Sequence, residues 1–353
     1  MDIDEYNRQI ESVAVEFLEI AGQFIHGFKF SLSPKTVLRR FIAHFGVTPR
    51  LCAILWIYCN DGVGIEGGQK KHLLWLLNLL KTDATENQLH GRWKADEKTI
   101  RKWSNIFIKA ISELSVVSVV IICVQCVFYS IWKQSLTLLK WLLPWSSDFS
   151  TADDQRPTSS LQIDWEYRKD KARTNCNVFV SIDGTDFRIQ EPSPFSASWY
   201  SHKFKGPGVR YEVGVCIATG WIVWFHGPFR CGSWSDEKIA QYGLNQILDW
   251  DELYIADGGY KSKGMVLNPD DAVSQEINDY MQICRTRHET INTLFKHFYC
   301  IGNRFHRDVK KHGLFAHAVA NIVQLGIMFD ELNPFDVYDH FEEPDSWQNE
   351  WET

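Results

Sequence analysis

The stretch Ser181-Ile-Asp-Gly-Thr-Asp-Phe-Arg188 decides the fold of this chain, because an apolar run gives way there to glycine and carboxylates. The residues from Asn177 to Ile182 are mostly β-branched or aromatic, which predicts a buried strand that ends at Asp183. Side chains alternate between the two faces of a strand. Asp183 and Asp186, three residues apart, therefore point to opposite sides, and we expect only Asp183 to join a shared site.

The patterns that follow this stretch predict the fold class. An Ala218-Thr-Gly220 turn between two apolar runs is typical of a β-hairpin. Strands that first form a meander and later alternate with helices indicate an α/β fold, with a mixed sheet flanked by helices. The predicted strands are 177–182, 211–217, 221–225 and 253–256, and the predicted helices are 235–248, 281–298 and 312–329.

A helical region precedes the strands. Residues 1–32 carry apolar positions at helical spacing, and 33–114 contain several further helices. One pair, from Thr85 and from Asp96, is joined through Gly91 in a helix-turn-helix-like pattern. In that interpretation the basic residues of the second helix contact DNA, although packed helices of any bundle give the same pattern. These DNA-binding candidates are Lys98, Arg101 and Lys102.

The segment 115–163 is foreign to this pattern. Residues 115–132 carry no charge, and about 20 apolar residues are needed to span a membrane, so the run is borderline. A buried core helix, an insertion and a mistranslated intron stay open, and the insertion is preferred to a membrane helix. Residues 331–353 form an acidic tail.

Composition and charge bound the class of protein. The chain has 353 residues and a net charge of −7, enough for a catalytic domain of about 100–200 residues plus a helical partner. Acidic residues gather at both ends, which leaves a basic middle, and phosphate binding needs only local positive surface. Nine scattered cysteines favour reduced, intracellular thiols. Further candidates for phosphate contact are Lys203, Lys205 and Arg210.

Two more carboxylates complete a pattern with Asp183. Asp257 follows the apolar run 253–256, and Glu289 lies in a polar stripe of a predicted helix beside Arg285. Carboxylates on a strand, at a strand end and on a helix can hold a pair of hard divalent cations, which promote in-line phosphoryl displacement. Taken singly, the two aspartates are also ordinary turn residues, and Glu289 is a partner for Arg285.

Five short motifs carry a resemblance to a known family: Asp183-Gly-Thr-Asp-Phe187, Lys203-Phe-Lys-Gly-Pro207, Gly232-Ser-Trp-Ser-Asp236, Asp257-Gly-Gly-Tyr260 and Arg287-His-Glu-Thr-Ile-Asn292. In their order, the chain resembles the Harbinger-type DDE transposases over residues 33–114 and 165–329. The resemblance implies an RNase H-like DDE catalytic domain over 164–330.

The resemblance also implies roles for residues. Asp183, Asp257 and Glu289 match the three catalytic, metal-binding acids of the family, which bind Mg²⁺ or Mn²⁺. Asp236 matches a further acid, and either binds metal or is an ordinary acid in the first turn of a helix.

The activity that follows is that of a metal-dependent DNA endonuclease and transposase, which hydrolyses phosphodiesters and transfers strands. A separate Myb-like DNA-binding partner and action in the nucleus are implied, with the cytoplasm and a homo-oligomer left open. The alternative is a domesticated, catalytically inactive derivative that binds DNA or protein.

Overall fold

The computed structural model describes residues 3–25, 33–62, 64–114, 165–169, 177–194, 196–262, 264–268 and 275–332. The predicted insertion, 115–163, and all but the first two residues of the acidic tail lie outside the described residues.

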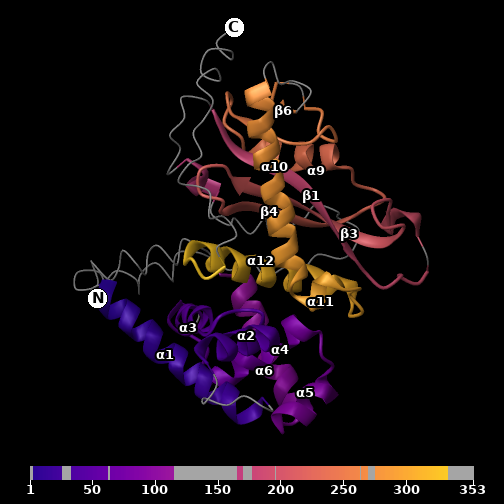
Figure 1. Cartoon of the computed structure of the whole chain (residues 1–353). Helices are drawn as coiled ribbons and strands as arrows, with labels where there is room; N and C mark the ends of the chain where they lie inside the picture. The colour runs from indigo at the N-terminus through magenta and orange to yellow at the C-terminus, as the bar shows by residue number, and fades with distance from the viewer. Residues whose placement is uncertain are drawn as a thin grey trace, which may run out of the picture.

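A mixed six-stranded sheet forms the second half of the described chain (Figure 1). Its central strand pairs on one side with an antiparallel neighbour, from Val180↔Cys216 to Arg188↔Gly208, and on the other side with a parallel one. The order across the sheet is β4-β3-β1-β5-β6, and β2 pairs with the beginning of β3. The strands are β1 (Val178–Arg188), β2 (Tyr200–Ser201), β3 (Gly206–Cys216), β4 (Ile222–Arg230), β5 (Leu253–Ile255) and β6 (Val266–Leu267).

Helices cover both faces of this sheet. On one face, α9 buries Ala240 against Val180 and Tyr254. On the other face, α10 runs along the sheet and leads into α11, as Figure 1 shows. The elements of this half are η2 (Trp165–Arg168), η3 (Ala197–Trp199), α9 (Asp236–Tyr242), η4 (Leu244–Gln246), α10 (Gln275–Lys296), α11 (Tyr299–Gly302), η6 (Val309–Lys311) and α12 (His312–Met328).

The first half of the chain is a bundle of helices that packs below the sheet in Figure 1. Proline at the first helical position and a left-handed Gly46 (φ 78°) delimit α2, as its sequence predicts. The elements are α1 (Ile3–Phe24), α2 (Pro34–Phe45), α3 (Pro49–Ile57), the π-helix η1 (Tyr58–Gly62), α4 (Lys70–Thr82), α5 (Glu86–Trp93) and α6 (Glu97–Ser112).

One hydrophobic core joins the bundle to the sheet. α12 is buried along nearly its whole length and packs on α6 on one side and on β4 on the other. Its Asn321 amide donates a hydrogen bond of 2.8 Å to the carbonyl oxygen of Ile111 on α6. The two halves are therefore packed as one body, with α12 as the shared element.

The α/β class, the hairpin at Gly220 and the helices of both halves are confirmed, but several predicted boundaries are wrong. β1 continues to Arg188 instead of ending at Asp183, because its second half pairs with β3 residue by residue. The predicted helix 235–248 is a short α9 followed by η4, and α10 ends at Lys296. Gly91 lies inside α5, and the turn before α6 is at Lys94, which is left-handed (φ 50°).

No single helix within the described ranges has the length and apolar character needed to cross a membrane. The bent pair Pro34–Phe45 and Pro49–Asn60, at 53°, meets the criterion by length and composition only. Buried core helices of soluble proteins share those features.

Candidate active site

Strand register brings two of the three predicted carboxylates together. Ser181 pairs with Ile255 in the parallel β1–β5 ladder, and Asp183 and Asp257 each follow two residues later. Because side chains repeat with a period of two along a strand, both carboxylates continue the same face at the end of β5. The turn after β5 fixes Asp257, whose Oδ1 accepts a hydrogen bond of 2.9 Å from the Gly259 amide.

The electrostatics of Asp183 agree with this placement. Its pKa is raised, first by burial and also by the negative charge of Asp257, against the opposing charges of Lys203 and Arg285. A cation bound near Asp183 would offset the negative charge of Asp257 that acts on it. The donor set is oxygen only, and oxygen ligands suit Mg²⁺ and Mn²⁺.

Glu289 lies on the helix that passes this pair. Its neighbour His288 is buried, with Nε2 2.9 Å from the hydroxyl oxygen of Ser181, two residues before Asp183. One turn further on, Asn292 lines the same cavity as Asp183. Glu289 is therefore held at the level of Asp183, on the polar side of α10, with an exposed side chain.

The described side chains of the candidate site do not form a complete metal-binding group. Within the described part of the chain, no three carboxylate, imidazole or thiol groups are close enough together to hold a metal ion. The β1–β5 register runs toward Asp183 and Asp257, and the side chain of Glu289 on α10 is exposed. That the three acids share one site stays a prediction.

Asp186 faces the opposite side of the sheet, as its spacing from Asp183 predicts. Its direct cross-strand partner is Arg210, whose Nε donates to Asp186 Oδ1 at 2.6 Å and Nη2 to Oδ2 at 3.1 Å. The Ser201 hydroxyl donates a third hydrogen bond at 2.5 Å. Although burial opposes it, these hydrogen bonds lower the pKa of Asp186 below its ordinary value.

Asp236 belongs to this second face. It begins α9 behind the Ser235 N-cap, and its Oδ1 lies 3.2 Å from Nη1 of Arg210. A Cβ on Gly184 would lie 2.2 Å from that oxygen, so glycine there leaves room for the Asp236 carboxylate. Burial raises the pKa of Asp236, and the charges of Asp186 and Asp257 add to the effect.

One oxygen of Asp236 offers a test of whether a cation fits. Oδ1 is buried and has no hydrogen bond of proper geometry, even though Arg210 lies nearby. Its other oxygen is near Gly259, because a Cβ there would meet Asp236 Oδ2 at 3.5 Å and Asp257 Oδ1 at 2.9 Å. Oδ2 is thus the oxygen on the Asp257 side, where a cation ligand would have to lie, and Oδ1 faces Arg210. Arg210 already neutralises much of its charge.

Arg210, a further candidate for phosphate contact, is largely buried and paired with Asp186 and Asp236. Its contact with DNA stays a prediction. Lys203 and Lys205 are exposed on the loop before β3, and the Lys203 ammonium donates a hydrogen bond of 2.7 Å to the carbonyl oxygen of Gly184. The Asp186–Arg210 pair could not be predicted from local sequence patterns, because it depends on the register between β1 and β3.

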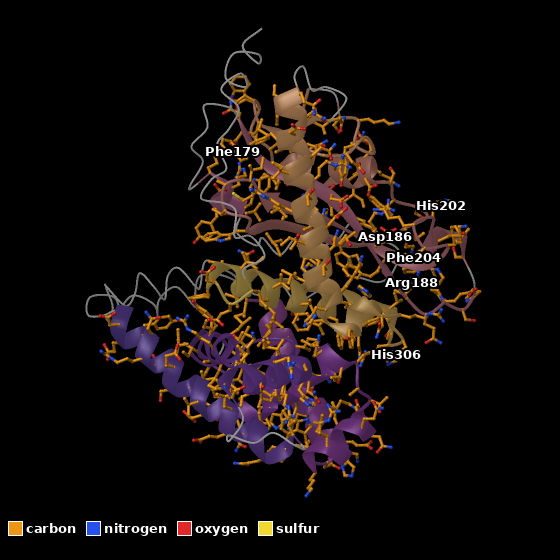
Figure 2. The ribbon with its side chains drawn as sticks, in the orientation of Figure 1. Phe179, Asp186, Arg188, His202, Phe204 and His306 are labelled. Atoms are coloured by element: carbon orange, nitrogen blue, oxygen red, sulfur yellow. The ribbon has the colours of Figure 1, made fainter. Side chains whose placement is uncertain are left out.

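A cavity of about 430 Å³ opens beside Asp183, a volume in the range of about 300–1,000 Å³ typical of ligand sites. Walls from β1, the 203–204 loop, α10 and α11 surround it. Figure 2 shows Asp186, Phe204 and Arg188 in succession along this part of the molecule. The lining residues are Asp183, Gly184, Thr185, Asp186, Phe187, Arg188, Lys203, Phe204, Asn292, Lys296, Ile301 and Gly302.

The candidate DNA-binding helix α6 presents its basic residues to solvent. Lys98, Arg101 and Lys102 are exposed, while Ile100 and Phe107 face the core. Arg101 is paired with Glu86 of α5, its Nε donating to Oε1 at 2.7 Å. The two helices exist and contact each other, and the helix-turn-helix interpretation and their contact with DNA stay predictions.

Comparison with known proteins gives one match. Neither the curated proteins nor the solved structures contain a significant match to the chain. Residues 182–324, which include Asp183, Asp236, Asp257 and Glu289, match the family described as DDE superfamily endonuclease.

Proposed function

We propose that this protein is a metal-dependent DNA endonuclease and transposase of the Harbinger type. The observation that carries the proposal is the β1–β5 register, which pairs Ser181 with Ile255, two residues before Asp183 and Asp257. The family match over residues 182–324 supports the nuclease class.

The arrangement of the sheet supports an RNase H-like domain. Three antiparallel strands are followed by two short strands parallel to β1, and α10 packs on the face that carries Asp183. In this proposal the first acid lies on the central strand, the second after its parallel neighbour, and the third on the helix. That order gives Asp183, Asp257 and Glu289 their roles as catalytic acids.

Asp183 and Asp257 would hold Mg²⁺ or Mn²⁺, with Glu289 turning inward from α10 and Asp236 as a further ligand. Such a cation pair, when bound, lowers the pKa of the attacking water and stabilises the leaving oxygen. Lys203 and Arg285, whose positive charges act on Asp183, orient and neutralise the phosphate of the strand to be cut. After hydrolysis, the freed 3′ hydroxyl would attack a phosphodiester of a second DNA strand, joining to its phosphorus while the 3′ oxygen of that strand leaves and takes up a proton.

Basic residues distant in sequence support a DNA-binding surface. Arg101 of α6 lines a second cavity of about 230 Å³ together with Arg307 and Lys311. All three act as positive charges on Glu86 and lower its pKa, after the larger effect of its hydrogen bond to Arg101. Further lysines lie on α6 (Lys98 and Lys102) and near the candidate site (Lys203 and Lys205). In this proposal they bind phosphates, which positions a duplex without reading its sequence.

The remaining parts of the proposal concern the cellular context. We propose action in the nucleus with a Myb-like partner protein that supplies sequence recognition, because the motifs resemble those of the Harbinger group. A homo-oligomer would let two copies hold two DNA ends.

The second candidate function is a catalytically inactive, DNA- or protein-binding derivative. The exposed side chain of Glu289 favours it, as does the lack of three metal-binding groups in close contact within the described ranges. In this alternative the basic surface persists and strand cutting is lost.

Nicking of supercoiled DNA in Mn²⁺ separates the two functions. The nuclease proposal expects nicking by the wild-type protein, and a loss of at least about a hundredfold in Asp183→Ala, Asp257→Ala and Glu289→Ala. Lys35→Ala, an exposed change on α2, is the matched control and should nick normally. DNA binding without nicking by the wild-type protein supports the derivative, and unchanged nicking in Asp183→Ala defeats the assignment of the site.

A further inference from the structure

We propose that the cavity beside Asp183 binds one unpaired nucleotide of the DNA strand, next to the phosphate that is cut. The inference rests on the proposed nuclease function, and it adds to that function a nucleotide site formed by Phe204, Arg188, Lys203 and Lys296.

The open edge of β1 provides the room. β5 pairs with β1 only as far as Ser181↔Ile255, and the next partner on that edge is Phe305, opposite Ile189. Between these points, in the part of the chain that the structure describes, no strand covers the edge of β1. The cavity occupies this gap and begins at Asp183. A strand of DNA in the gap would therefore run directly past the candidate catalytic acid.

Positive charge reaches the cavity from both walls. Lys203 extends from the loop before β3, and Lys296 from the last turn of α10. The Lys203 ammonium uses one of its three donors on the carbonyl oxygen of Gly184, which fixes its position and leaves two donors for a ligand. Lys296 is exposed, and Asn292 adds an amide one turn earlier on the same helix face. Two ammonium groups and an amide around a gap suit a phosphodiester.

Phe204 gives the cavity an aromatic wall. The Arg188 guanidinium lies 5.0 Å from the centroid of the Phe204 ring. The ring also packs against the backbone of β3, where a Cβ on Gly208 would meet Phe204 Cζ at 2.4 Å. Glycine there lets the ring lie close to the strand, and Arg188 covers it in turn. A ring and a guanidinium plane fixed in this way form a platform on which any base can stack.

The size of the cavity fits a nucleotide better than a duplex. About 430 Å³ is within the range of small-molecule sites, about 300–1,000 Å³, and is walled by four elements. Enzymes that act on DNA commonly take a nucleotide out of the helix to reach it. We expect the phosphates to lie between Lys203 and Lys296, and the base to stack at Phe204 and Arg188.

Fluorescence anisotropy tests the proposal in EDTA, where no strand is cut. Three labelled duplexes of one sequence are compared: one with a single unpaired nucleotide, one with an abasic residue at that position, and one fully paired. The wild-type protein should bind the unpaired base about tenfold more tightly than the abasic residue, the usual size of one stacking contact. Phe204→Leu, which keeps the packing volume but not the flat ring, should reduce this preference to near one.

A charge variant tests the phosphate contact separately. Lys296→Ala should weaken binding of all three duplexes by a similar factor and lower the salt dependence by about one phosphate contact. Trp250→Ala, which removes an aromatic side chain that is 96% exposed, and Lys35→Ala are the matched controls and should bind as the wild type does. Thermal unfolding confirms that each variant is folded.

The outcomes separate this proposal from the nuclease function. Equal binding of base and abasic residue by the wild type, or an unchanged preference in Phe204→Leu, overturns the nucleotide site even if the protein nicks DNA. A preference for the unpaired base that is lost in Phe204→Leu supports the nucleotide site. Absence of nicking in the same protein would count against the nuclease function alone.

Discussion

Asp183 and Asp186 lie on the same strand and face opposite sides of the sheet, and only Asp186 is neutralised by a bidentate partner, Arg210. Asp183 instead lies beside Asp257, and both burial and that like charge raise its pKa. The two carboxylates of one motif therefore have different functions: Asp186 stabilises the sheet, and Asp183 is available for chemistry.

Replacing Asp186 should lower the stability of the protein, whereas replacing Asp183 should lower its activity. Asp186→Ala leaves the buried Arg210 without its main partner, which typically costs about 3–5 kcal/mol of unfolding free energy. Asp183→Ala removes a carboxylate whose pKa is raised by burial, so it should change the unfolding free energy little while it abolishes nicking. Urea unfolding measures both, and the double variant Asp186→Ala/Arg210→Met should recover much of the loss. A cost below about 1 kcal/mol for Asp186→Ala would show that the pair contributes no more than a surface ion pair.

Gly184 is expected to be intolerant of any side chain. The methyl group of Gly184→Ala would lie 2.2 Å from Asp236 Oδ1, so the Asp236 carboxylate must move from its place beside Arg210. We expect a loss of about 1–3 kcal/mol, the typical cost of overpacking, together with reduced nicking. Gly91→Ala is the control, because a Cβ there meets nothing within 4 Å and alanine favours the helix. Equal stability of the two variants would contradict the close approach of Asp236.

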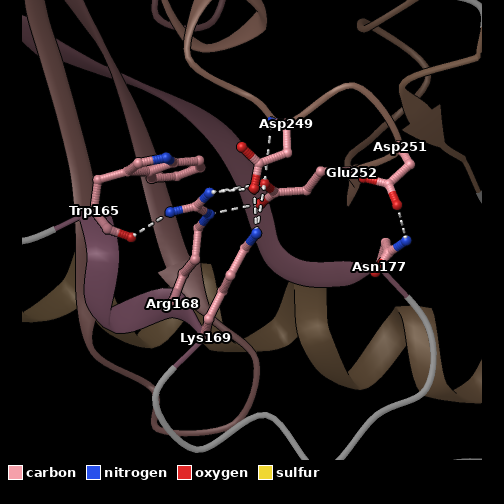
Figure 3. Close-up of polar contacts among 7 residues, drawn as sticks. All are labelled: Trp165, Arg168, Lys169, Asn177, Asp249, Asp251 and Glu252. Carbon is pink, nitrogen blue, oxygen red and sulfur yellow. Dashed lines mark hydrogen bonds and ion pairs between the residues drawn. The ribbon is translucent and has the colours of Figure 1, made fainter.

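A buried ion pair involves Glu252, the residue directly before β5. Arg168 of η2 donates to both oxygens of Glu252, at 2.7 and 2.9 Å, and Figure 3 shows this pair beside the ring of Trp165. Arg168→Ala leaves Glu252 buried without its close ion pair, beside a Lys169 ammonium 4.0 Å away, for an expected loss of about 3–5 kcal/mol. Lys169→Ala removes an exposed partner of Asp249 and should cost about 1 kcal/mol or less. Chemical denaturation compares them, and similar losses would argue against a buried pair.

Acid should destabilise the protein through histidines that are buried in neutral form. Burial lowers the pKa of His312 to about 3 and that of His317 to about 4. Because these values lie below that of the unfolded chain, their stabilising contribution is present above about pH 6.5 and is lost as the pH falls. Each histidine should contribute a slope of up to about 1.4 kcal/mol per pH unit below pH 6.5.

His312→Gln tests this pH dependence. Glutamine can keep a hydrogen bond to the Tyr211 hydroxyl, which lies 2.8 Å from His312 Nδ1. The variant should be less stable at pH 7 and should lose about one proton's share of the slope between pH 6.5 and 4. Parallel stability curves for the variant and the wild type would contradict a neutral His312.

Much of the fold could be predicted from the sequence, because local signals coincide with the structure. Gly46 and Gly220 end a helix and close a hairpin as their positions predict, and the apolar stripe from Met281 to Phe295 is buried along α10. The length of β1 could not be predicted. Gly184 and Asp186 are typical of a turn, and only the distant partner Arg210 makes them compatible with a strand.

The candidate site shows the same limit. Asp183 and Asp257 could be chosen because each follows an apolar run, and the register places them side by side. The charge of Arg210 makes it a candidate for DNA contact, but its burial beside Asp186 could not be predicted. Phe204 and Arg188 lie in quoted motifs, but their contact could not be predicted, because it depends on Gly208 of a neighbouring strand. Tertiary partners decide which charged residues are free, and a single sequence does not contain them.

Anomalous scattering from crystals of the protein soaked in Mn²⁺ tests the central claim most directly. The proposed function predicts a manganese peak bonded to carboxylate oxygens of both Asp183 and Asp257, with Glu289 turned inward to complete the site. Asp183→Ala crystals should lose the peak. A peak elsewhere on the molecule, or none between these two aspartates at a Mn²⁺ concentration that supports nicking, would contradict it.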